Sequence, residues 1–220
     1  KIRELDKAGE YPFEACTALA EAGINGLVYP EEYGGQGGSF MDLAVLGEAL
    51  GYHYGGIAQA WGITCIYAGM HIALHGSEAM KREILPKVIS GDMRLALCLS
   101  EPDHGSAVAS IEALAVRDGD DYVINGSKIW TSNAHRANHI FCLVRTKDTE
   151  RRQEGISFLL FPMDCPGITV KPIINIVGEH RFNQVFFDDV RVPQSCRLGA
   201  ENDGWTVAKY LLEFERGGSA

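Results

Sequence analysis

The segment from Cys98 to Ser106 carries the strongest chemical signal in the chain. It reads Cys-Leu-Ser-Glu-Pro-Asp-His-Gly-Ser and follows a short apolar run that predicts a buried strand. A loop that combines a kinked backbone, two hydroxyls and a glycine can offer several N–H groups and hydroxyls to an anionic or polar cofactor. An ordinary polar loop has the same composition, so this segment alone leaves both interpretations open.

A second segment, Asn125 to Asn133, favours the cofactor interpretation. Asn125 and Gly126 predict a turn, and the strand expected after it carries Trp130 with hydroxyl-bearing residues on either side. An aromatic plane with hydroxyl donors beside it is what a protein needs to hold a flat heteroaromatic ring. Together the two segments indicate a site for such a ring.

Metal and phosphate sites are less well supported. His71 and His75 lie four apart on a predicted helix, but no Glu follows the first His and no third ligand is evident, so core histidines are favoured over zinc. The glycines from Gly34 to Gly38 have neither the preceding strand nor the Gly-Lys-Ser/Thr of a phosphate loop, which favours a flexible turn. The pair Asp188-Asp189 is typical of a solvated strand end. We therefore expect no metal.

The elements that position these residues change character near Arg94. Before it, helical apolar spacing predicts helices at about 12–22, 39–51, 56–75 and 77–89, the third apolar on all sides and hence buried. After it, short β-rich runs separated by turn signals predict an antiparallel barrel or sandwich. The runs are 95–99, 113–116, 122–124, 139–144, 156–161, 168–170 and 184–187.

The fold expected is thus α+β. We predict an all-α helical domain over 1–93, a β domain over 94–197 and, over 198–220, the first helix of a further helical bundle. That last helix has an apolar stripe, which we expect a longer polypeptide or another subunit to cover.

Composition narrows the class of protein. Among 220 residues, 29 Asp and Glu outnumber 20 Lys and Arg for a net charge of −9, with no basic run, which argues against nucleic-acid binding. Charged residues or His interrupt the apolar runs, so we expect no membrane span, and no signal peptide is evident. Six cysteines without C-x-x-C spacing predict buried free thiols in a reducing compartment.

The two segments resemble the acyl-CoA dehydrogenase family. Its flavin site has a Thr-Glu-Pro-Gly-Ala-Gly-Ser-Asp loop, similar to Ser100–Ala107, and an Asn-Gly-x-Lys-x-Trp-Ile-Thr-Asn strand, similar to Asn125–Asn133. Tyr29–Gly35 and Phe186–Pro193 also look like landmarks of the family and occur in its order. The resemblance covers the whole chain and implies an N-terminal helical domain, a central β domain and a C-terminal four-helix domain.

The resemblance also implies a cofactor, FAD, and residues that bind it. In the loop these are Leu97, Leu99, Ser100, Gly105 and Ser106, and beside the isoalloxazine they are Trp130, Thr131 and Ser132. Ser132 stands where a family threonine bonds flavin N5, and Ser106 should also contact the acyl-CoA substrate. The chain departs from the family at Asp103 and His104, which replace Gly-Ala, and at Ala107, which replaces a common Asp.

The implied reaction is α,β-desaturation of an acyl-CoA thioester. A glutamate removes the α proton while the β hydrogen leaves as hydride to flavin N5. Glu215, followed by Arg216, matches the position of the base in the long-chain and isovaleryl-type branches, so we expect Glu215 to be catalytic and Arg216 to help hold the substrate. The alternative is a surface ion pair, with the base in a later part of the third domain.

Partners and rival functions follow from the same resemblance. It implies an electron-transferring flavoprotein as electron acceptor, a homo- or hetero-tetramer, and a location in the bacterial cytoplasm or, in a eukaryote, the mitochondrial matrix. Acyl-CoA oxidase or flavin monooxygenase chemistry on the same fold stays open, as does a non-catalytic partner subunit. We expect this chain alone to be inactive.

Overall fold

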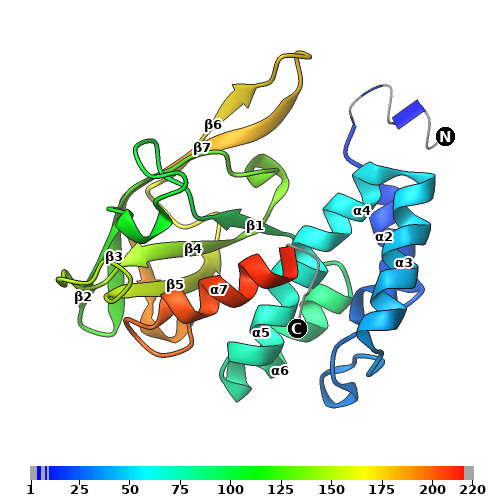
Figure 1. Ribbon diagram of the computed structural model, residues 1–220, viewed down its shortest axis with the longest axis horizontal. Coiled ribbons are helices and arrows are strands. Elements are labelled where there is room, and N and C mark those ends of the chain that lie inside the picture. The colour runs from blue at the N-terminus through cyan, green and yellow to red at the C-terminus, as the bar shows by residue number, and fades with distance from the viewer. Residues whose placement is uncertain (1–3, 6–7, 9, 216–220) are drawn as a thin grey trace. The chain divides into compact units, whose positions relative to one another are not determined.

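The computed structural model describes residues 4–5, 8 and 10–215, without the side chains of residues 214 and 215. It forms two compact units, residues 1–94 and 95–220, which are described separately below. The first is helical and the second is built on a sheet that is mostly antiparallel (Figure 1). The α+β fold class expected from the sequence is confirmed.

The first unit contains helices where apolar periodicity predicts them. Its elements are α2 (Phe13–Glu21), η1 (Ile24–Gly26), η2 (Glu31–Tyr33), α3 (Phe40–His53), α4 (Gly55–Trp61), η3 (Gly62–Ala68), α5 (Gly69–His75) and α6 (Glu78–Ile89). A capping box begins α3, since the Ser39 hydroxyl accepts from Asp42 N and the Asp42 carboxylate accepts from Ser39 N. The glycine turn before it is fastened to the unit: the amide of Gly38 donates to the Leu27 carbonyl at 2.8 Å.

The elements α4, η3 and α5 form one long helix, whose middle, η3, is a π-helical segment. This helix corrects the expectation that no apolar run is long enough to span a membrane. Gly55–His75 has 21 residues, contains no Asp, Glu, Lys or Arg, and has a mean hydropathy of 1.3 over its most apolar window, so it passes the length and composition test for a membrane span. Two-thirds of its most apolar window (67%) is buried inside the chain, as in the core helix of a folded domain. Its burial follows from the lack of a polar face.

The second unit is one sheet of eight strands. They are β1 (Leu95–Cys98), β2 (Leu114–Asp118), β3 (Asp121–Lys128), β4 (His139–Arg145), β5 (Ile156–Pro162), β6 (Ile168–Ile174), β7 (His180–Pro193) and β8 (Arg197–Leu198). Their order is β6-β7-β3-β2-β4-β5-β8, with β1 parallel to β4. The short helices η4 (Val108–Ser110), η5 (Ala134–Arg136) and η6 (Gln194–Cys196) lie between strands.

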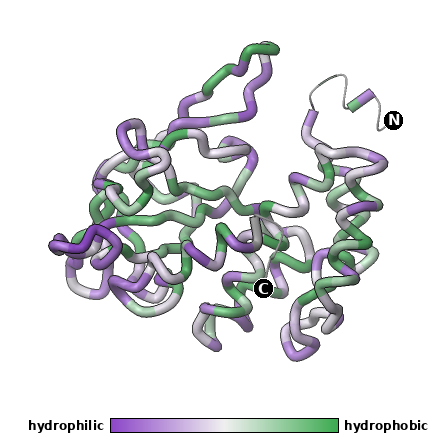
Figure 2. Tube along the Cα trace, in the orientation of Figure 1, coloured by the Kyte–Doolittle hydropathy of each residue, from purple (hydrophilic) through white to green (hydrophobic). Residues whose placement is uncertain are grey.

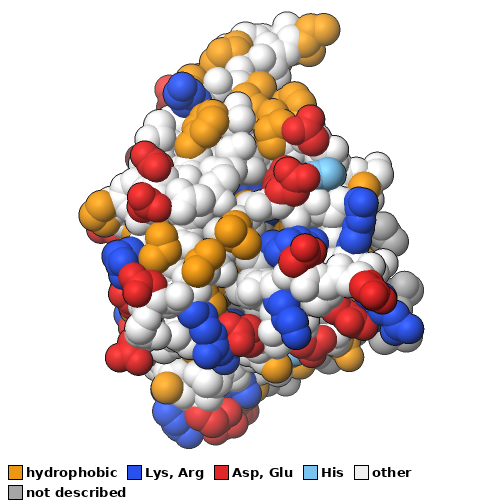
Figure 3. Space-filling view, turned by 90° about the vertical axis from the view of Figure 1, so that its left-hand side faces the viewer, with side chains coloured by type: hydrophobic (Ala, Val, Ile, Leu, Met, Phe, Trp, Pro, Cys, Tyr) orange, Lys and Arg blue, Asp and Glu red, His pale blue; other side chains and the backbone are white. Residues whose placement is uncertain are grey.

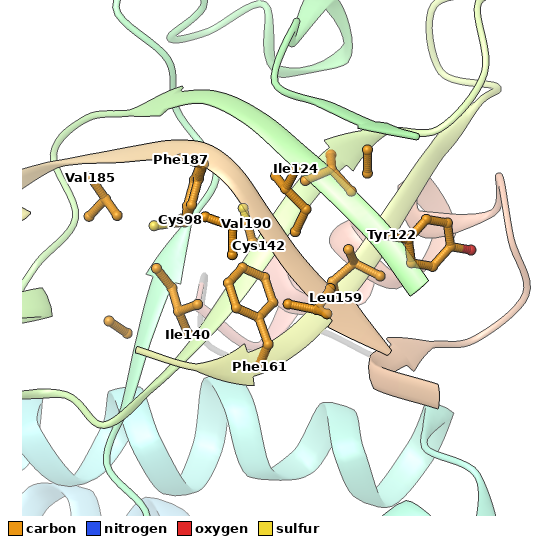
Figure 4. Close-up of a cluster of buried hydrophobic side chains, with 14 of the residues drawn as sticks. Cys98, Tyr122, Ile124, Ile140, Cys142, Leu159, Phe161, Val185, Phe187 and Val190 are labelled. Atoms are coloured by element: carbon orange, nitrogen blue, oxygen red, sulfur yellow. The ribbon is translucent and has the colours of Figure 1, made fainter. Parts of the chain in front are cut away.

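The core of this unit lies between strands from distant parts of the sheet. Figure 4 shows Val185, Phe187 and Val190 of β7 facing Ile140 of β4 and Phe161 of β5. All five side chains are at most 4% exposed. The sheet therefore bends over its own apolar face, as a sandwich or barrel must.

The Asn125-Gly126 pair does not form the turn expected from the sequence. It lies inside β3 at a β-bulge, where pairing with β7 shifts register between Ile124 and Gly126. Gly126 has φ 139°, and a Cβ there would lie 2.7 Å from Ala113 Cα. The Asn125 side-chain amide bonds to the backbone N–H and to the carboxylate of Asp189, both at 2.9 Å. Asp189 lies within β7, not at the end of a strand as expected.

The last helix, α7 (Gly204–Glu215), packs against β5 of its own unit. Val207, Ala208 and Leu211 on its apolar stripe are at most 3% exposed. At its start, a Cβ on Gly204 would lie 2.6 Å from the Ser157 carbonyl carbon, so the glycine permits close contact with the strand. This part of the stripe is covered within the chain, contrary to the expectation that another element or subunit must do so.

A ribbon formed by β6 and β7 projects from the sheet. Apolar residues gather near its tip (Figure 2), where Ile174, Ile176 and Val177 are 58%, 103% and 71% exposed. Figure 3 shows hydrophobic side chains along this ribbon, whereas charged side chains of both signs are scattered over the face below it.

Candidate cofactor site

The first motif forms a closed turn directly after β1. Glu101 and His104 bond to each other through both backbone N–H and C=O groups, at 3.1 Å each, around Pro102 and Asp103. The His104 ring is half-buried, with Nε2 3.4 Å from the Glu112 carboxylate. Asp103 and His104, which depart from the family pattern, are thus accommodated in a regular turn, and Gly105 and Ser106 follow it on the surface.

A buried ion pair holds this turn to β3. Lys128 Nζ lies 2.8 Å from the Glu101 carboxylate, and their side chains are 0% and 6% exposed. The ammonium also donates to the Leu99 carbonyl at 3.2 Å. The carboxylate further accepts from the backbone N–H groups of Glu112 at 2.7 Å and Ala113 at 2.9 Å. Charge pairing and these hydrogen bonds are what allow two such groups to be buried.

Neither residue of this pair was among the site residues predicted from the sequence. The sequence feature that could have indicated the pair is a lysine on the inward face of β3. Tyr122 and Ile124 face inward on this strand, and so does Lys128. A charged residue at an inward position requires a partner of opposite charge. Glu101, placed directly after a buried strand, is the matching signal.

The two motifs are joined at their backbones. Ile129 N donates to the Ser100 carbonyl at 2.9 Å, and the Thr131 hydroxyl lies 3.2 Å from Cys98 Sγ. The residues predicted in the loop and those predicted around Trp130 are therefore brought together at one end of β1 and β3.

Trp130 does not lie on a strand, as the sequence had suggested, but just beyond the end of β3. Its φ is 61°, a left-handed conformation that is unusual for a bulky residue. The indole is 58% exposed and meets the ring of Phe182 edge-on, with centroids 6.2 Å apart and planes at 83°. An indole face is thus left available at the surface of the site.

Thr131 is turned into the protein. Its side chain is 1% exposed and its hydroxyl is against Cys98, whose thiol pKa is raised by burial. Its backbone N–H donates to the Asn183 carbonyl at 3.0 Å, and its carbonyl accepts from Asn183 Nδ2 at 2.9 Å. These internal bonds occupy the polar atoms of Thr131, so a cofactor contact through its hydroxyl is not favoured.

Three predicted hydroxyls remain available. Over the described residues, no hydrogen bond is formed by the side chains of Ser100, Ser106 or Ser132. Ser100 and Ser132 are half-buried and Ser106 is exposed, while Leu97 and Leu99 are half-buried on either side of Cys98. This arrangement offers hydroxyl groups, an indole face and apolar side chains to a ligand.

The predicted base and its neighbour lie at the limit of the structure. Glu215 is the last residue of α7, and its side chain and the whole of Arg216 lie outside the described residues.

Metal binding finds no support in the part of the chain that the structure describes. There, no group of three His, Cys, Asp or Glu residues is placed to hold an ion. His71 is fully buried in the long helix, and burial lowers its pKa to about 4. None of the six cysteines forms a disulfide: Cys65, Cys98 and Cys142 are buried and the other three half-buried.

Comparison with known proteins identifies the family. Residues 1–92 match the model of the acyl-CoA dehydrogenase N-terminal domain, and residues 96–190 match that of the middle domain. The chain belongs to the acyl-CoA dehydrogenase family. The acyl-CoA dehydrogenase IpdE1 of Mycobacterium tuberculosis is 39% identical over 207 residues, which cover 90% of this chain and 51% of IpdE1.

Two solved structures with the same fold are a dehydrogenase and a complex of two proteins. The complex of glutaryl-coenzyme A dehydrogenase with glutaryl-CoA matches with a TM-score of 0.90 at 28% identity, over 97% of this chain and 55% of that one. The ChsE4–ChsE5 complex from Mycobacterium tuberculosis matches with a TM-score of 0.85 at 34% identity, over 96% and 54% of the two chains. The chain spans about half the length of the acyl-CoA dehydrogenases it matches.

Proposed function

We propose that this chain supplies the FAD-binding half of an enzyme that desaturates an acyl-CoA thioester between its α and β carbons. The observation that carries the proposal is the junction of the two motifs. Lys128 and Glu101 hold the first motif against the second, and the joined segments carry the exposed indole of Trp130 and the unbonded hydroxyls of Ser100 and Ser132. Acyl-CoA dehydrogenases of known structure with the same fold support the substrate class.

The residues present fit FAD. A flat heteroaromatic ring needs an aromatic or apolar surface and a few polar groups at its edge. Trp130 offers the surface, Ser100 and Ser132 offer hydroxyls, and the backbone of Leu97, Leu99 and Gly105 completes the loop we assign to FAD. Thr131 contributes by fixing the segment rather than through its hydroxyl.

The roles of the chain's own residues follow from these positions. When bound, FAD supplies the acceptor for the β hydrogen and its electron pair. With FAD bound, the Ser132 hydroxyl would donate a hydrogen bond to flavin N5, which would favour the reduced cofactor. Ser106, exposed beyond the turn, is assigned to the acyl-CoA.

Removal of the α proton requires a positioned base. An α proton of a thioester is too weakly acidic for a free carboxylate, so orientation and stabilisation of the developing enolate must supply most of the rate. We assign the base to Glu215 and substrate holding to Arg216, on the strength of the family position of this Glu-Arg pair.

The wider setting is proposed from the same relatives. The substrate is an acyl-CoA, with steroid side chains and dicarboxylic acids included beside fatty acids, and the electron acceptor is an electron-transferring flavoprotein. A tetramer is the proposed assembly, and its hetero-oligomeric form is supported by the ChsE4–ChsE5 complex. The bacterial cytoplasm, or the mitochondrial matrix in a eukaryote, is the proposed location.

Flavin content and flavin reduction test the proposal. Protein that carries this chain is purified with added FAD, its absorbance spectrum is recorded, and a panel of acyl-CoA thioesters is then added without oxygen. We expect bound flavin, bleached by at least one thioester, and re-oxidation by electron-transferring flavoprotein faster than by oxygen. Faster re-oxidation by oxygen would indicate an oxidase, and protein that never takes up flavin would contradict the proposal.

A further inference from the structure

The side chain of Asn183 on β7 is the centre of a polar cluster behind the Trp130–Ser132 segment. The side chain is 0% exposed, and its amide contacts three other residues. Its Nδ2 donates to the Thr131 carbonyl at 2.9 Å and lies 3.1 Å from His135 Nδ1, and its Oδ1 lies 2.7 Å from His180 Nε2. The backbone N–H of Thr131 also donates to the backbone carbonyl of Asn183. Asn183 therefore bonds to both the N–H and the C=O of Thr131.

Hydrogen-bond directions fix the protons of this cluster. A carbonyl oxygen can only accept, so the amide NH₂, not the amide oxygen, must face Thr131. The second N–H of that group then points at His135 Nδ1, which must accept and therefore carries no proton. His180 Nε2 faces the amide oxygen and must donate. The network is complete only while His135 is neutral.

The two imidazoles also stack on each other. The rings of His135, in η5, and His180, at the start of β7, have centroids 3.7 Å apart and planes at 20°. The charged neighbours of the two rings in sequence are Arg136 on η5, Arg181 on β7, and Glu179, whose backbone and carboxylate bond to Asn175. Burial, then the charges of His180 and Arg136, lower the pKa of His135. The surroundings thus favour the neutral ring that the network needs.

The segment held by Asn183 is one that would not keep its shape unaided. Trp130 and Asn133 both have left-handed backbones, with φ of 61° and 56°, on either side of Thr131 and Ser132. Such residues persist where surrounding contacts over-determine them. Here the contacts are the two Thr131–Asn183 bonds and one from Asn133 N to the Arg181 carbonyl at 2.9 Å.

We propose that Asn183 is a positioning residue that fixes Trp130 and Ser132 for flavin through Thr131, and that it does so only while His135 is neutral. The assignment of flavin to this segment rests on the proposed function, whereas the positioning of the segment does not. The positioning of the segment and its binding of flavin are therefore tested separately.

The test uses Trp130 as a local reporter. Trp61→Phe and Trp205→Phe leave it as the one tryptophan, and its emission and acrylamide quenching are compared in Asn183→Asp and in Gln184→Glu. Both substitutions exchange an amide for a carboxylate on neighbouring residues of β7, but no hydrogen bond involves the Gln184 side chain over the described residues. We expect more quenching and a red shift in Asn183→Asp alone, because its carboxylate would face the Thr131 carbonyl.

FAD binding is measured on the same proteins. We expect the FAD dissociation constant to rise about tenfold in Asn183→Asp, which corresponds to about 1.4 kcal/mol, and to stay unchanged in Gln184→Glu. The midpoint potential of the remaining bound flavin should fall, since Ser132 no longer stabilises the reduced form. Unchanged Trp130 emission in folded Asn183→Asp would overturn the positioning role, whether or not FAD binds. If Asn183→Asp alters Trp130 emission but the parent protein binds no FAD, the positioning role is supported and the proposed function is refuted.

A pH titration keeps the test decisive if Asn183→Asp does not fold. In the parent reporter, Trp130 emission should change as the pH falls below the ordinary histidine pKa of 6.5, because the pKa of His135 is lowered, while far-ultraviolet circular dichroism stays constant. His135→Gln, which retains an acceptor but cannot titrate, should remove the change. A pH-independent Trp130 in the parent would contradict the requirement for neutral His135.

Discussion

Lys128 and Glu101, which lie 27 positions apart in the chain, form a charge pair at 2.8 Å with almost no access to solvent. The pair joins the loop after β1 to the last residue of β3. The pair thus joins both cofactor motifs in the interior of the sheet, together with the bonds from Ile129 to Ser100 and from Thr131 to Cys98.

Lys128→Met should destabilise the protein by about 3–5 kcal/mol, because it leaves a buried carboxylate without its counter-charge. Urea unfolding measures the loss. Arg151→Met is the control, since its pair with Glu154 is 3.6 Å long and both side chains are mostly exposed, and it should change stability by no more than about 1 kcal/mol. Equal effects of the two substitutions would show that the buried pair has no special weight.

Gly126→Ala should be more harmful than Gly119→Ala. Both glycines have positive φ, 139° and 63°, but only at Gly126 would the new Cβ meet backbone, 2.7 Å from Ala113 Cα. We expect a loss of about 1 kcal/mol from the turn glycine and at least about twice that from the bulge. Thermal unfolding of the two variants side by side checks the order, and a reversed order would rule out the close approach of β3 to Ala113.

His71 should make the stability of the helical unit depend on pH. Its pKa lies at about 4 in the folded chain and at 6.5 ordinarily, so the unfolded chain takes up the proton first as the pH falls. Its contribution is complete above pH 6.5 and decreases toward pH 4, by about 3 kcal/mol in all. Urea unfolding of the parent and of His71→Gln, at both ends of this pH range, gives the free energy of unfolding. Its dependence on pH should be smaller in the variant. His53→Gln, at an exposed position, is expected to keep the parental slope.

Ser132→Ala should weaken FAD binding and lower the flavin midpoint potential, because it removes a hydrogen bond worth about 1 kcal/mol. Ser195→Ala, at an exposed serine of the same unit, is the control. Titration with FAD and potentiometry provide the two measurements. A potential equal in both variants would exclude Ser132 from contact with the flavin.

Glu215→Gln should abolish turnover while flavin binding is retained, because the amide cannot take up the α proton. Rapid mixing with an acyl-CoA, followed by flavin absorbance, measures the reductive step directly. Glu213→Gln, two residues earlier on α7 and with an exposed side chain, is the matched control. Near-normal flavin reduction in Glu215→Gln would assign the base to another residue.

Local patterns located most elements of the fold, but they missed β8 and most of β7, and they did not give the contacts between elements. Apolar periodicity located the long helix and the alternation of the strands, because each depends on neighbours in sequence. The Asn125-Gly126 pair was misplaced because a turn and a bulge both need a positive φ, and only the pairing of β3 with β7 distinguishes them.

The candidate site shows the same division. Sequence motifs indicated Ser100, Ser106 and Ser132, whose hydroxyls the structure leaves unbonded. They did not indicate Glu101, Lys128 or Asn183, since each acts on a residue brought close by the folding of distant strands. The Thr131 side chain likewise points into the protein directly after the left-handed backbone of Trp130, a conformation that no local sequence pattern specifies.

The carboxylate of Glu101 has a consequence for hydrogen exchange. It accepts the amide protons of Glu112 and Ala113, so two amides outside any strand are protected by a side chain of the cofactor loop. Their exchange with solvent requires the ion pair with Lys128 to open, and with it the end of β3. A polar surface loop is thereby part of the cooperative folding unit of the sheet, and it should open with the sheet rather than before it.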